Sequence, residues 1–304
     1  MHTPVLLKES IAILDPKPEE FFIDGTVGSG GHSEAILEKI GPNGKLLCVD
    51  WDEKAIKNLK NFKFKDLKKN VILVNGNYAN LPEILKENNL PKADGLIVDL
   101  GFSSEQLSSG KGFSFMKDEP LDMRYGDGEM TAAEVINSFN EKDLADIFWK
   151  YGEERFSRQI AKKIVEERRK KRILTTFELV EIIKKAVPKF YEKGRIHPAT
   201  RVFQALRIYV NRELENLETL LKNLDKIIKN KPPHQTKLWC GGKGRVAIIS
   251  FHSLEDRLVK NYFRQMAKEG LAEILTKKPI TPSEEEIKNN PRSRSAKMRA
   301  IELK

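Results

Sequence analysis

Short apolar runs alternate with helical patterns over the first hundred residues. Four apolar runs bounded by turn residues predict buried strands, at 21–24, 45–50, 70–75 and 93–100. Three segments between them have helical spacing, at 33–40, 52–61 and 81–86. A short amphipathic helix is expected before the first strand, because Leu7, Ile11 and Leu14 recur at helical spacing. This order predicts a parallel sheet whose ligand lies at the carboxyl ends of the strands.

The pattern changes after the fourth strand. Residues 101–127 show little periodicity, and unstructured loops of that length are uncommon unless they are functional. Residues 131–187 are helical in pattern, and Thr131-x-x-Glu134 and Thr175-x-x-Glu178 fit capping boxes. One long helix with an apolar stripe is then expected from Pro198 through Leu221.

The last part of the chain returns to strand patterns. Residues 245–251 predict another strand and 254–268 a helix, with Ser253 and Asp256 as its N-terminal capping pair. Residues 281–295 are polar and are expected to form an exposed loop, whereas 296–303 fit a final strand.

A glycine-rich turn follows the first strand. Residues 25–31 hold four glycines in seven positions, which let the backbone approach a ligand closely. The dinucleotide fingerprint is not met, because Ser33 stands where its third glycine belongs, and no Gly-Lys-Ser/Thr follows for a P-loop. Asp50, about twenty residues further on, ends the second strand and can accept hydrogen bonds from ribose hydroxyls.

The run Asp-Gly-Thr-Val-Gly-Ser-Gly-Gly at 24–31 is similar to motif I of S-adenosylmethionine-dependent methyltransferases. A purely structural turn is the alternative interpretation of these glycines.

From the strand order, this motif and the helical segment that follows the fourth strand, we expect an α/β fold, a Rossmann-like methyltransferase sheet with an inserted all-helical domain. The expected boundaries are 1–110 and 201–304 for the two parts of the core and 111–200 for the insertion, a candidate for substrate recognition.

Composition narrows the class of partner and the compartment. Lys and Arg number 54 against 44 Asp and Glu, and the net charge of +10 favours a polyanion such as nucleic acid. Cys48 and Cys240 have no metal-ligand spacing, nothing indicates a metal site, and a buried free thiol at Cys48 suits a reducing compartment. Neither a signal peptide nor a membrane-spanning run is recognisable, so we expect a cytoplasmic protein without membrane contact.

Asp99 ends the fourth strand, where a methyl donor and its acceptor would meet. Methylation of an amine is a direct displacement that needs alignment, shielding from water and an outlet for one proton. A carboxylate there can align the donor or hold the amine, although it can also simply cap the following loop. Methylation at carbon 5 of pyrimidines needs a cysteine nucleophile, typically after proline, and neither cysteine follows one.

Several other residues have both a functional and a structural interpretation. Phe113 and Phe115 can stack on an extruded base or anchor their loop on the core. Arg124 can contact substrate or pair with Asp122. His252, at a strand-to-helix junction, can handle a proton near neutral pH or serve as a hydrogen-bonded structural residue.

Basic residues are the candidates for RNA contact. The run from Arg168 to Arg172 includes Arg169, and Arg201 and Arg207 follow it in the chain. Charge runs are also common at solvated helix ends, and Glu166 and Glu167 partly offset this one. Arg294 belongs to a second basic cluster, at 292–299.

Taken together, the motifs resemble the bacterial ribosomal RNA small-subunit methyltransferase H family, whose members methylate N4 of a decoding-site cytidine in 16S rRNA. The matching segments run in order along the whole chain: 2–7, 24–32, 99–104, 112–116, 120–124, 151–154, 197–201, 203–207, 250–257 and 292–299. Glu119 and Phe102 are small departures from the family's pattern.

The resemblance implies S-adenosyl-L-methionine as methyl donor and 16S rRNA or the small ribosomal subunit as partner. Its donor site corresponds to seven residues here: Gly30, Gly31, His32, Asp50, Tyr78, Asp99 and Gln106. The glycine turn and the strand ends point independently to Gly30, Gly31, Asp50 and Asp99, whereas His32 and Gln106 rest on the resemblance alone. Tyr78 would pack on the adenine ring or be a core aromatic residue.

The resulting hypothesis is an rRNA cytosine-N4 methyltransferase. A DNA amino-methyltransferase is one rival, but Asp99-Leu100-Gly101-Phe102 differs from the Pro-Pro-Tyr/Phe pattern common in that class. An RNA-binding ribosome-assembly factor with little turnover is the other rival. The sequence leaves open the nucleotide modified, the assembly state of the substrate, the proton acceptor and the oligomeric state, a dimer included.

Overall fold

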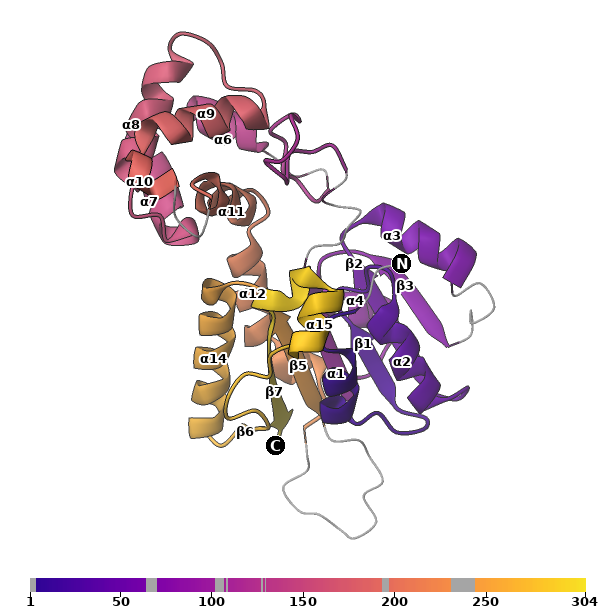
Figure 1. Cartoon of the computed structure of the whole chain (residues 1–304). Helices are drawn as coiled ribbons and strands as arrows, with labels where there is room; N and C mark the ends of the chain where they lie inside the picture. Colours follow the sequence, from indigo (N-terminus) through magenta and orange to yellow (C-terminus); the bar gives the residue numbers. More distant parts are fainter. Residues whose placement is uncertain are drawn as a thin grey trace. The chain divides into compact units, whose positions relative to one another are not determined.

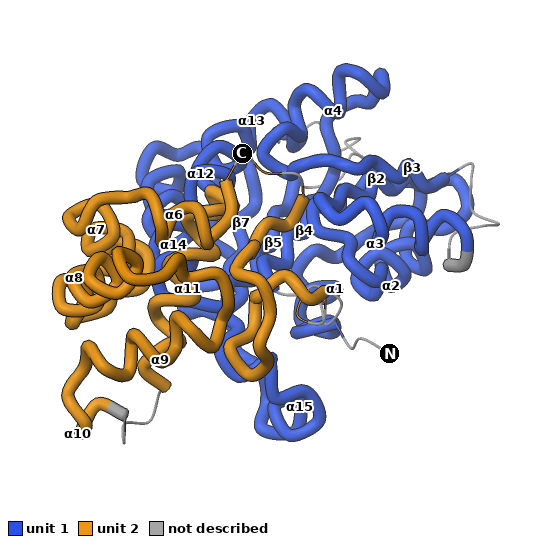
Figure 2. The backbone as a smooth tube through the Cα atoms, turned by 90° about the horizontal axis from the view of Figure 1, so that it is seen from above, with its two compact units in different colours: residues 1–101, 214–304 blue, residues 102–213 orange. Residues whose placement is uncertain are grey.

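The computed structural model describes residues 4–63, 70–101, 107, 109–126, 128, 130–192, 197–230 and 244–304, with the backbone alone at 62, 63 and 192. Two compact units make up the chain (Figure 2): one holds Met1–Gly101 and Leu214–Lys304, and the other holds Phe102–Glu213. The segment expected as the insertion, 111–200, falls within the second unit. Residues 201–213 belong to it as well, since helix α11 (Ala199–Val210) packs along α7 (Glu141–Gly152).

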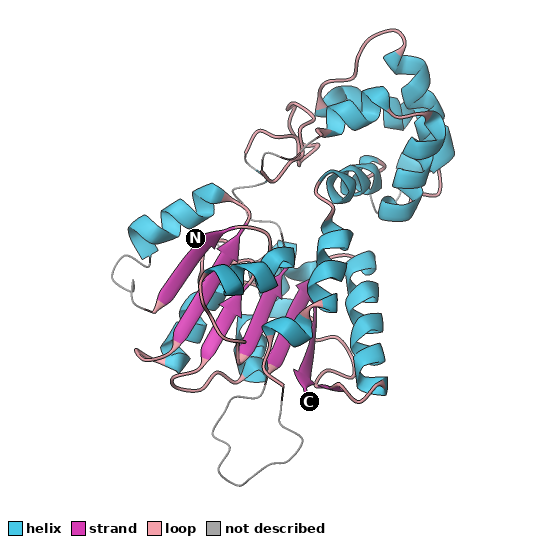
Figure 3. Ribbon diagram, turned by 180° about the vertical axis from the view of Figure 1, so that it is seen from behind, coloured by secondary structure: helices cyan, strands magenta, loops and turns pink. Residues whose placement is uncertain are grey.

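A seven-stranded sheet forms the centre of the first unit (Figures 1 and 3). In chain order the strands are β1 Phe21–Asp24, β2 Lys45–Asp50, β3 Val71–Asn75, β4 Gly95–Asp99, β5 Arg245–Ser250, β6 Ala272–Ile274 and β7 Lys297–Leu303. Their spatial order is β3-β2-β1-β4-β5-β7-β6, in which β1 to β5 are parallel and β7 is antiparallel to its neighbours. The predicted parallel α/β sheet is confirmed. The short strand β6 carried no recognisable pattern.

Helices cover both faces of this sheet, because side chains along each strand alternate between the faces. Phe21 and Ile23 point to one face and Phe22 to the other. The first face packs against α4 (Leu81–Glu87), α12 (Glu213–Lys222), α13 (Leu224–Ile227) and α14 (Ser253–Lys268). The second face packs against α1 (Leu7–Leu14), α2 (Gly31–Ile40) and α3 (Glu53–Asn58). Strands buried on both faces explain the nearly continuous apolar runs.

Helices are the regular elements of the second unit in its described residues. Besides α7 and α11 it contains α6 (Ala132–Ser138), α8 (Ser157–Arg168), α9 (Thr176–Ala186) and α10 (Lys189–Glu192). The capping boxes Thr131–Glu134 and Thr175–Glu178 are both present and begin α6 and α9. Residues 109–126 contain neither helix nor strand, as the lack of periodicity predicted.

Three details of the predicted pattern are wrong. The long helix from Pro198 is two helices, because Arg212 adopts a left-handed conformation (φ 50°) and the Asn211 side chain bonds the loop at Met123 and Tyr125. Residues 281–295 form α15 (Glu284–Asn289) and a 3-10 helix (Pro291–Ser295) rather than a loop. The capping pair of α14 is one residue earlier than predicted, as described below.

Among the helices that the structure describes, none combines the length and apolarity needed to span a bilayer.

Candidate functional site

The candidate donor site lies where the strand order of the sheet reverses. The chain runs from β1 to β2 on one side and returns to β4 on the other side of β1. In open α/β sheets, ligands bind beyond the carboxyl ends of the strands at such a point. Asp24, Asp50 and Asp99 end β1, β2 and β4, so the topology brings three carboxyl groups to one edge.

Hydrogen bonds fasten the turn after β1 to the end of β4. The Asp99 N–H donates to Thr26 Oγ1 at 2.7 Å, and the Gly25 N–H donates to the Ile97 carbonyl at 2.9 Å. Asp99 Oδ1 in turn accepts the Gly101 N–H at 2.9 Å. The position of Asp99 is therefore fixed from both sides. Sequence reasoning missed Thr26, although a hydroxyl side chain just past a strand end is a common partner for a backbone donor.

Asp50 holds the other side of the turn. Its Oδ2 accepts the Gly28 N–H at 2.7 Å and its Oδ1 accepts the Asp52 N–H at 2.9 Å. Each carboxylate oxygen has two lone pairs, so these bonds orient the group and leave it able to accept ribose hydroxyls. Burial raises the pKa of Asp50, and the bonds from Asp52 and Gly28 oppose that rise.

The glycines have separate local reasons. Gly28 (φ 49°) and Gly30 (φ 77°) are left-handed, and Gly30 stands at the N-terminal end of α2. A Cβ on Gly31 would lie 2.7 Å from the Pro4 ring, so glycine at this position lets the residues just before α1 pack against the start of α2. The first N–H groups of α2, at Gly31 and His32, lack carbonyl partners within the helix, which suits them to bind an anionic group.

The His32 side chain does not extend from this turn toward solvent. Its ring is buried, and Nε2 lies 3.1 Å from the Val5 carbonyl oxygen. Burial lowers the pKa of His32, so the ring is neutral near pH 7. If His32 contacts the donor, its backbone N–H is therefore the group in position to do so.

A buried polar cluster lies beneath the turn. Asp24 Oδ2 accepts the Ser33 hydroxyl at 2.7 Å and Asp24 Oδ1 accepts the Thr26 N–H at 3.2 Å. Burial raises the pKa of Asp24 to about 6, against the opposing effects of His32 and Ser33. Cys48 is a buried free thiol, as predicted, and burial raises its pKa well above its usual range. Sequence reasoning noted Asp24 only as a strand end; the structure shows that it supports Thr26.

Tyr78 begins a 3-10 helix (Tyr78–Asn80) after β3 and is half-buried. It lies beside the glycine turn, because a Cβ on Gly25 would come within 3.3 Å of Tyr78 Cβ and 3.1 Å of Val98 Cγ2. The ring also packs against the core, so the structure gives it a structural reason beside the predicted adenine contact. Gln106 and residues 102–104 lie outside the described residues.

His252 caps α14. Its Nδ1 accepts the Glu255 N–H at 3.3 Å, and Glu255 Oε2 accepts the N–H groups of Phe251 and His252 at 2.8 and 3.3 Å. The predicted pair Ser253–Asp256 is therefore wrong by one residue, and Asp256 instead pairs with Arg299 at 2.6 Å. Because Nδ1 accepts this bond, a ring proton lies on Nε2, which is buried 3.1 Å from Glu255 Oε1 but makes no hydrogen bond among the described residues. The capping contacts explain His252 structurally; its role in proton transfer stays a prediction.

The aromatic candidates of the second unit contact other rings. Phe113 stacks on Tyr125 with centroids 5.4 Å apart. Phe115 stacks on His197 at 4.7 Å and meets Phe203 edge-on at 5.4 Å. These contacts favour the structural interpretation, in which both rings anchor their loop.

Arg124 pairs with Asp122 in a fork. Its Nε donates to Oδ1 at 2.7 Å and its Nη2 to Oδ2 at 3.0 Å, while Nη1 donates to the Gly128 carbonyl at 2.8 Å. Burial alone would raise the pKa of Asp122, but the Arg124 bonds and charge outweigh it and lower the pKa. The geometry is that of a half-buried structural pair.

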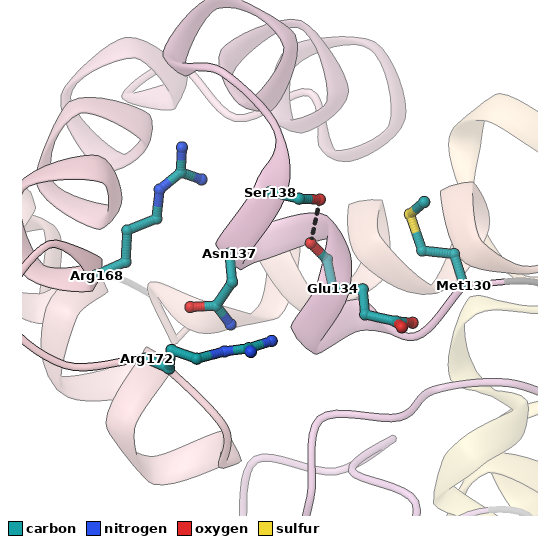
Figure 4. A pocket seen from close by; sticks show the side chains of 6 residues that line it. All are labelled: Met130, Glu134, Asn137, Ser138, Arg168 and Arg172. Atoms are coloured by element: carbon teal, nitrogen blue, oxygen red, sulfur yellow. Dashed lines mark hydrogen bonds between the residues drawn. The ribbon is translucent and has the colours of Figure 1, made fainter.

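Arg168 lines a pocket of about 530 Å³ in the second unit (Figure 4), but its Nη1 already donates to the Ile136 carbonyl at 2.6 Å. The pocket is formed by six side chains: Met130, Glu134, Asn137, Ser138, Arg168 and Arg172. Arg169 and Arg294 are exposed on the second and first unit respectively, and Arg201 Nη1 donates to the Glu153 carbonyl at 3.2 Å. Of the RNA candidates, Arg169 and Arg294 are the most accessible.

Chemically, the edge formed by Gly28, Gly30, Asp50 and Asp99 offers positioned amides and carboxylates but no cysteine nucleophile among its described residues. Such a site suits a ligand with hydroxyl, amino and carboxylate groups. It suits direct transfer between two bound molecules better than covalent catalysis.

Comparisons with known proteins find relatives that match nearly the whole chain. The family model described as the MraW methylase family matches residues 1–304. The chain is 46% identical to ribosomal RNA small subunit methyltransferase H of Clostridium botulinum, covering 98% of this chain and 97% of the relative. It is 42% identical to the protein of the same name from Syntrophobacter fumaroxidans, covering 99% and 96%. The protein of that name from Dehalococcoides mccartyi is 45% identical, with 99% and 86% covered.

Proposed function

The chain belongs to the MraW methylase family, and from that premise we propose that it methylates the exocyclic N4 amine of a cytidine in the decoding region of 16S rRNA. It is an rRNA methyltransferase that uses S-adenosyl-L-methionine as methyl donor. The proposal therefore concerns the atom modified, its place in the RNA and the residues that carry the reaction.

The single observation that carries the residue assignment is the geometry of the sheet edge. Asp50 accepts the Gly28 N–H and Asp99 accepts the Gly101 N–H, while the Asp99 N–H donates to the Thr26 hydroxyl. The left-handed glycines leave the turn without side chains at Gly28 and Gly30. This shape fits S-adenosylmethionine, whose sulfonium methyl supplies the electrophile when it is bound.

Each part of the site has a distinct task in this assignment. Asp50 accepts the ribose hydroxyls, and the first N–H groups of α2 receive the methionine carboxylate. Tyr78 packs against the adenine. The glycine turn between them excludes water by lying close to the ligand.

Asp99 is assigned to the amine. The Gly101 N–H donates to Asp99 Oδ1 and so orients the plane of the carboxylate. This orientation sets the direction in which Oδ2 can accept a hydrogen bond. A hydrogen bond from the N4 amine to this carboxylate aligns the nitrogen lone pair for direct displacement on the methyl group. The new C–N bond would form as the S–CH3 bond of the donor breaks, S-adenosylhomocysteine would leave, and the proton released by the nitrogen would pass to the Asp99 carboxylate. His252 is the alternative acceptor; because its Nδ1 accepts the Glu255 N–H, it would have to give up that capping bond to take the proton.

Basic residues in each of the two units are assigned to contacts with the RNA. We assign the helical unit to substrate recognition, with the accessible Arg169 and, in the first unit, Arg294 on the phosphate backbone. The partner would be 16S rRNA or the small ribosomal subunit, and the site of action the cytoplasm.

The test is methyl transfer from labelled S-adenosylmethionine to three substrates in parallel: unmethylated small ribosomal subunits, naked 16S rRNA and DNA. Mass spectrometry of the product nucleosides should give N4-methylcytidine from a ribosomal substrate. Labelled DNA alone would overturn the RNA assignment. Donor binding without transfer to any substrate would instead favour the assembly-factor function.

A further inference from the structure

Two sequence motifs that the donor site does not use meet in the second unit. They are Tyr151-Gly152-Glu153-Glu154, at the end of α7, and His197-Pro198-Ala199-Thr200-Arg201, at the start of α11. Gln204 Nε2 donates to the Tyr151 carbonyl at 3.2 Å, and a Cβ on Gly152 would lie 2.5 Å from the Arg201 carbonyl oxygen. The two helices thus touch through backbone at this point, which fixes the residues that follow α7.

Those residues build a rigid aromatic cluster. The Glu154 carboxylate is fully buried; its Oε1 accepts the Phe156 N–H and its Oε2 accepts the Tyr191 hydroxyl, both at 2.8 Å. The Phe156 and Tyr191 rings meet edge-on, with centroids 4.9 Å apart. Tyr191 belongs to α10, so Glu154 attaches that short helix to the end of α7.

An arginine lies over this cluster. The Arg155 guanidinium carbon is 4.9 Å from the Phe156 centroid, 4.8 Å from that of Tyr191 and 6.0 Å from that of Phe190. The Phe190 ring, unlike its neighbours, is 66% exposed. A large phenyl ring exposed to this extent contributes little to the core, whereas Glu154 holds Phe156 and Tyr191 by hydrogen bonds.

Charge around the cluster is mainly positive. Arg155 and Lys189 are exposed, and Arg201 is close enough to Tyr191 to oppose the rise in its pKa that burial and Glu154 produce. Among the side chains that the structure describes, Glu153, whose carbonyl accepts from Arg201, is an exposed carboxylate, and Glu154 is buried and bonded through both oxygens. Exposed aromatic rings beside arginines are typical of surfaces that bind single-stranded nucleic acid.

We propose that Phe190 and Arg155 form a stacking site for an unpaired base of the RNA substrate, with Arg201 and Lys189 beside its phosphates. This inference rests on the proposed function and adds to it a recognition surface in the helical unit. The base stacks on the exposed Phe190 ring and lies beside the Arg155 guanidinium. A paired base would not fit, because both of its faces are covered within a helix.

The test compares RNA affinity of the full chain and its Phe190→Ala variant, using fluorescence anisotropy with a single-stranded oligonucleotide of roughly ten nucleotides. The same sequence as a duplex serves as second probe. Phe190→Ala should weaken binding of the single strand roughly tenfold and leave duplex binding and the salt dependence unchanged, since no charge is removed. Phe190→Trp should bind like the parent.

Phe177→Ala is the matched control, because Phe177 is also an exposed phenylalanine (45%) of the helical unit. It lies at the start of α9, whereas α10 follows the other end of that helix. This variant should bind both probes like the parent. The proposal is overturned if Phe190→Ala binds the single strand like the parent, if Phe177→Ala weakens binding equally, or if single strand and duplex lose affinity alike. Methyl transfer is measured separately: its absence in the parent chain overturns the proposed function, whereas an active parent with an unaffected Phe190→Ala variant overturns the stacking site alone.

Discussion

The two compact units place their functional groups in different ways. In the sheet unit, the groups of the donor site directly follow strands, so Asp50 and Asp99 reach the same edge through parallel pairing. In the helical unit, the important contacts join distant segments, as when Tyr191 bonds Glu154 or Phe115 stacks on His197. The comparison teaches that a site made by strand ends is visible in sequence, whereas a site made by helix packing is not.

The largest effect on catalysis is expected at Asp99, in the sheet unit. Asp99→Ala removes the group assigned to align the amine, so kcat for methyl transfer should fall at least about 100-fold. The substitution also removes the acceptor of the Gly101 N–H, which changes the edge where the donor binds. Donor affinity is therefore measured alongside by isothermal titration calorimetry. A kcat close to that of the parent, with donor bound, would show that alignment depends on other residues.

Asp50 should affect the donor more than the RNA. Asp50→Ala removes the ribose acceptor and leaves the Gly28 N–H without its partner, so donor affinity should fall roughly 10- to 100-fold. The control Asp50→Asn retains one acceptor oxygen and should lose less. Unchanged donor affinity in Asp50→Ala would refute the ribose assignment, and RNA affinity should not change in either variant.

Asp24 should give the sheet unit a pH-dependent stability. Its folded pKa, about 6, is above the unfolded value, so the folded state holds the proton more tightly. Its contribution to stability is therefore present below the unfolded pKa and is lost as pH rises through about 6. Relative to Asp24→Asn, the parent should lose about 2 kcal/mol of unfolding free energy between roughly pH 4 and pH 7. Urea unfolding at a series of pH values measures this; parallel curves would contradict it.

Thr26 should link stability to catalysis. Thr26→Val replaces the hydroxyl with a methyl group of similar size and leaves the Asp99 N–H without its acceptor. Unfolding free energy should fall by about 1 kcal/mol, with a several-fold loss of kcat. Thr26→Ser keeps the acceptor and should restore most of both. Equal behaviour of the two variants would mean that the hydroxyl acceptor of the Asp99 N–H does not decide stability or kcat.

The smallest effect is expected in the helical unit. Arg124→Met breaks the fork with Asp122, a half-buried pair, and should lower unfolding free energy by roughly 0.5 to 1 kcal/mol. Donor affinity by calorimetry should equal that of the parent. A large loss of donor affinity in Arg124→Met would contradict the assignment of donor binding to the sheet unit alone.

The features whose places in the fold were predicted correctly have a local cause, whereas their roles in the candidate site stay predictions. The glycine turn and the strand-end acids were predictable because each strand is buried and its end is marked by a change to polar residues. His32 was predicted as a donor residue, but its neutral ring is buried against Val5, a contact between segments that spacing cannot reveal. Gln106 stays a prediction, since it lies outside the described residues.

The sequence alone determined the parallel α/β sheet, the glycine turn, two capping boxes and the family, because these depend on periodicity and on residues close together in the chain. The tertiary structure decided which side chain holds Asp99, how Asn211 and Arg212 divide a helical pattern in two, and that Arg155 lies over the aromatic rings of Phe156 and Tyr191. These contacts join residues that approach only after folding, and their distances depend on packing rather than on spacing along the chain.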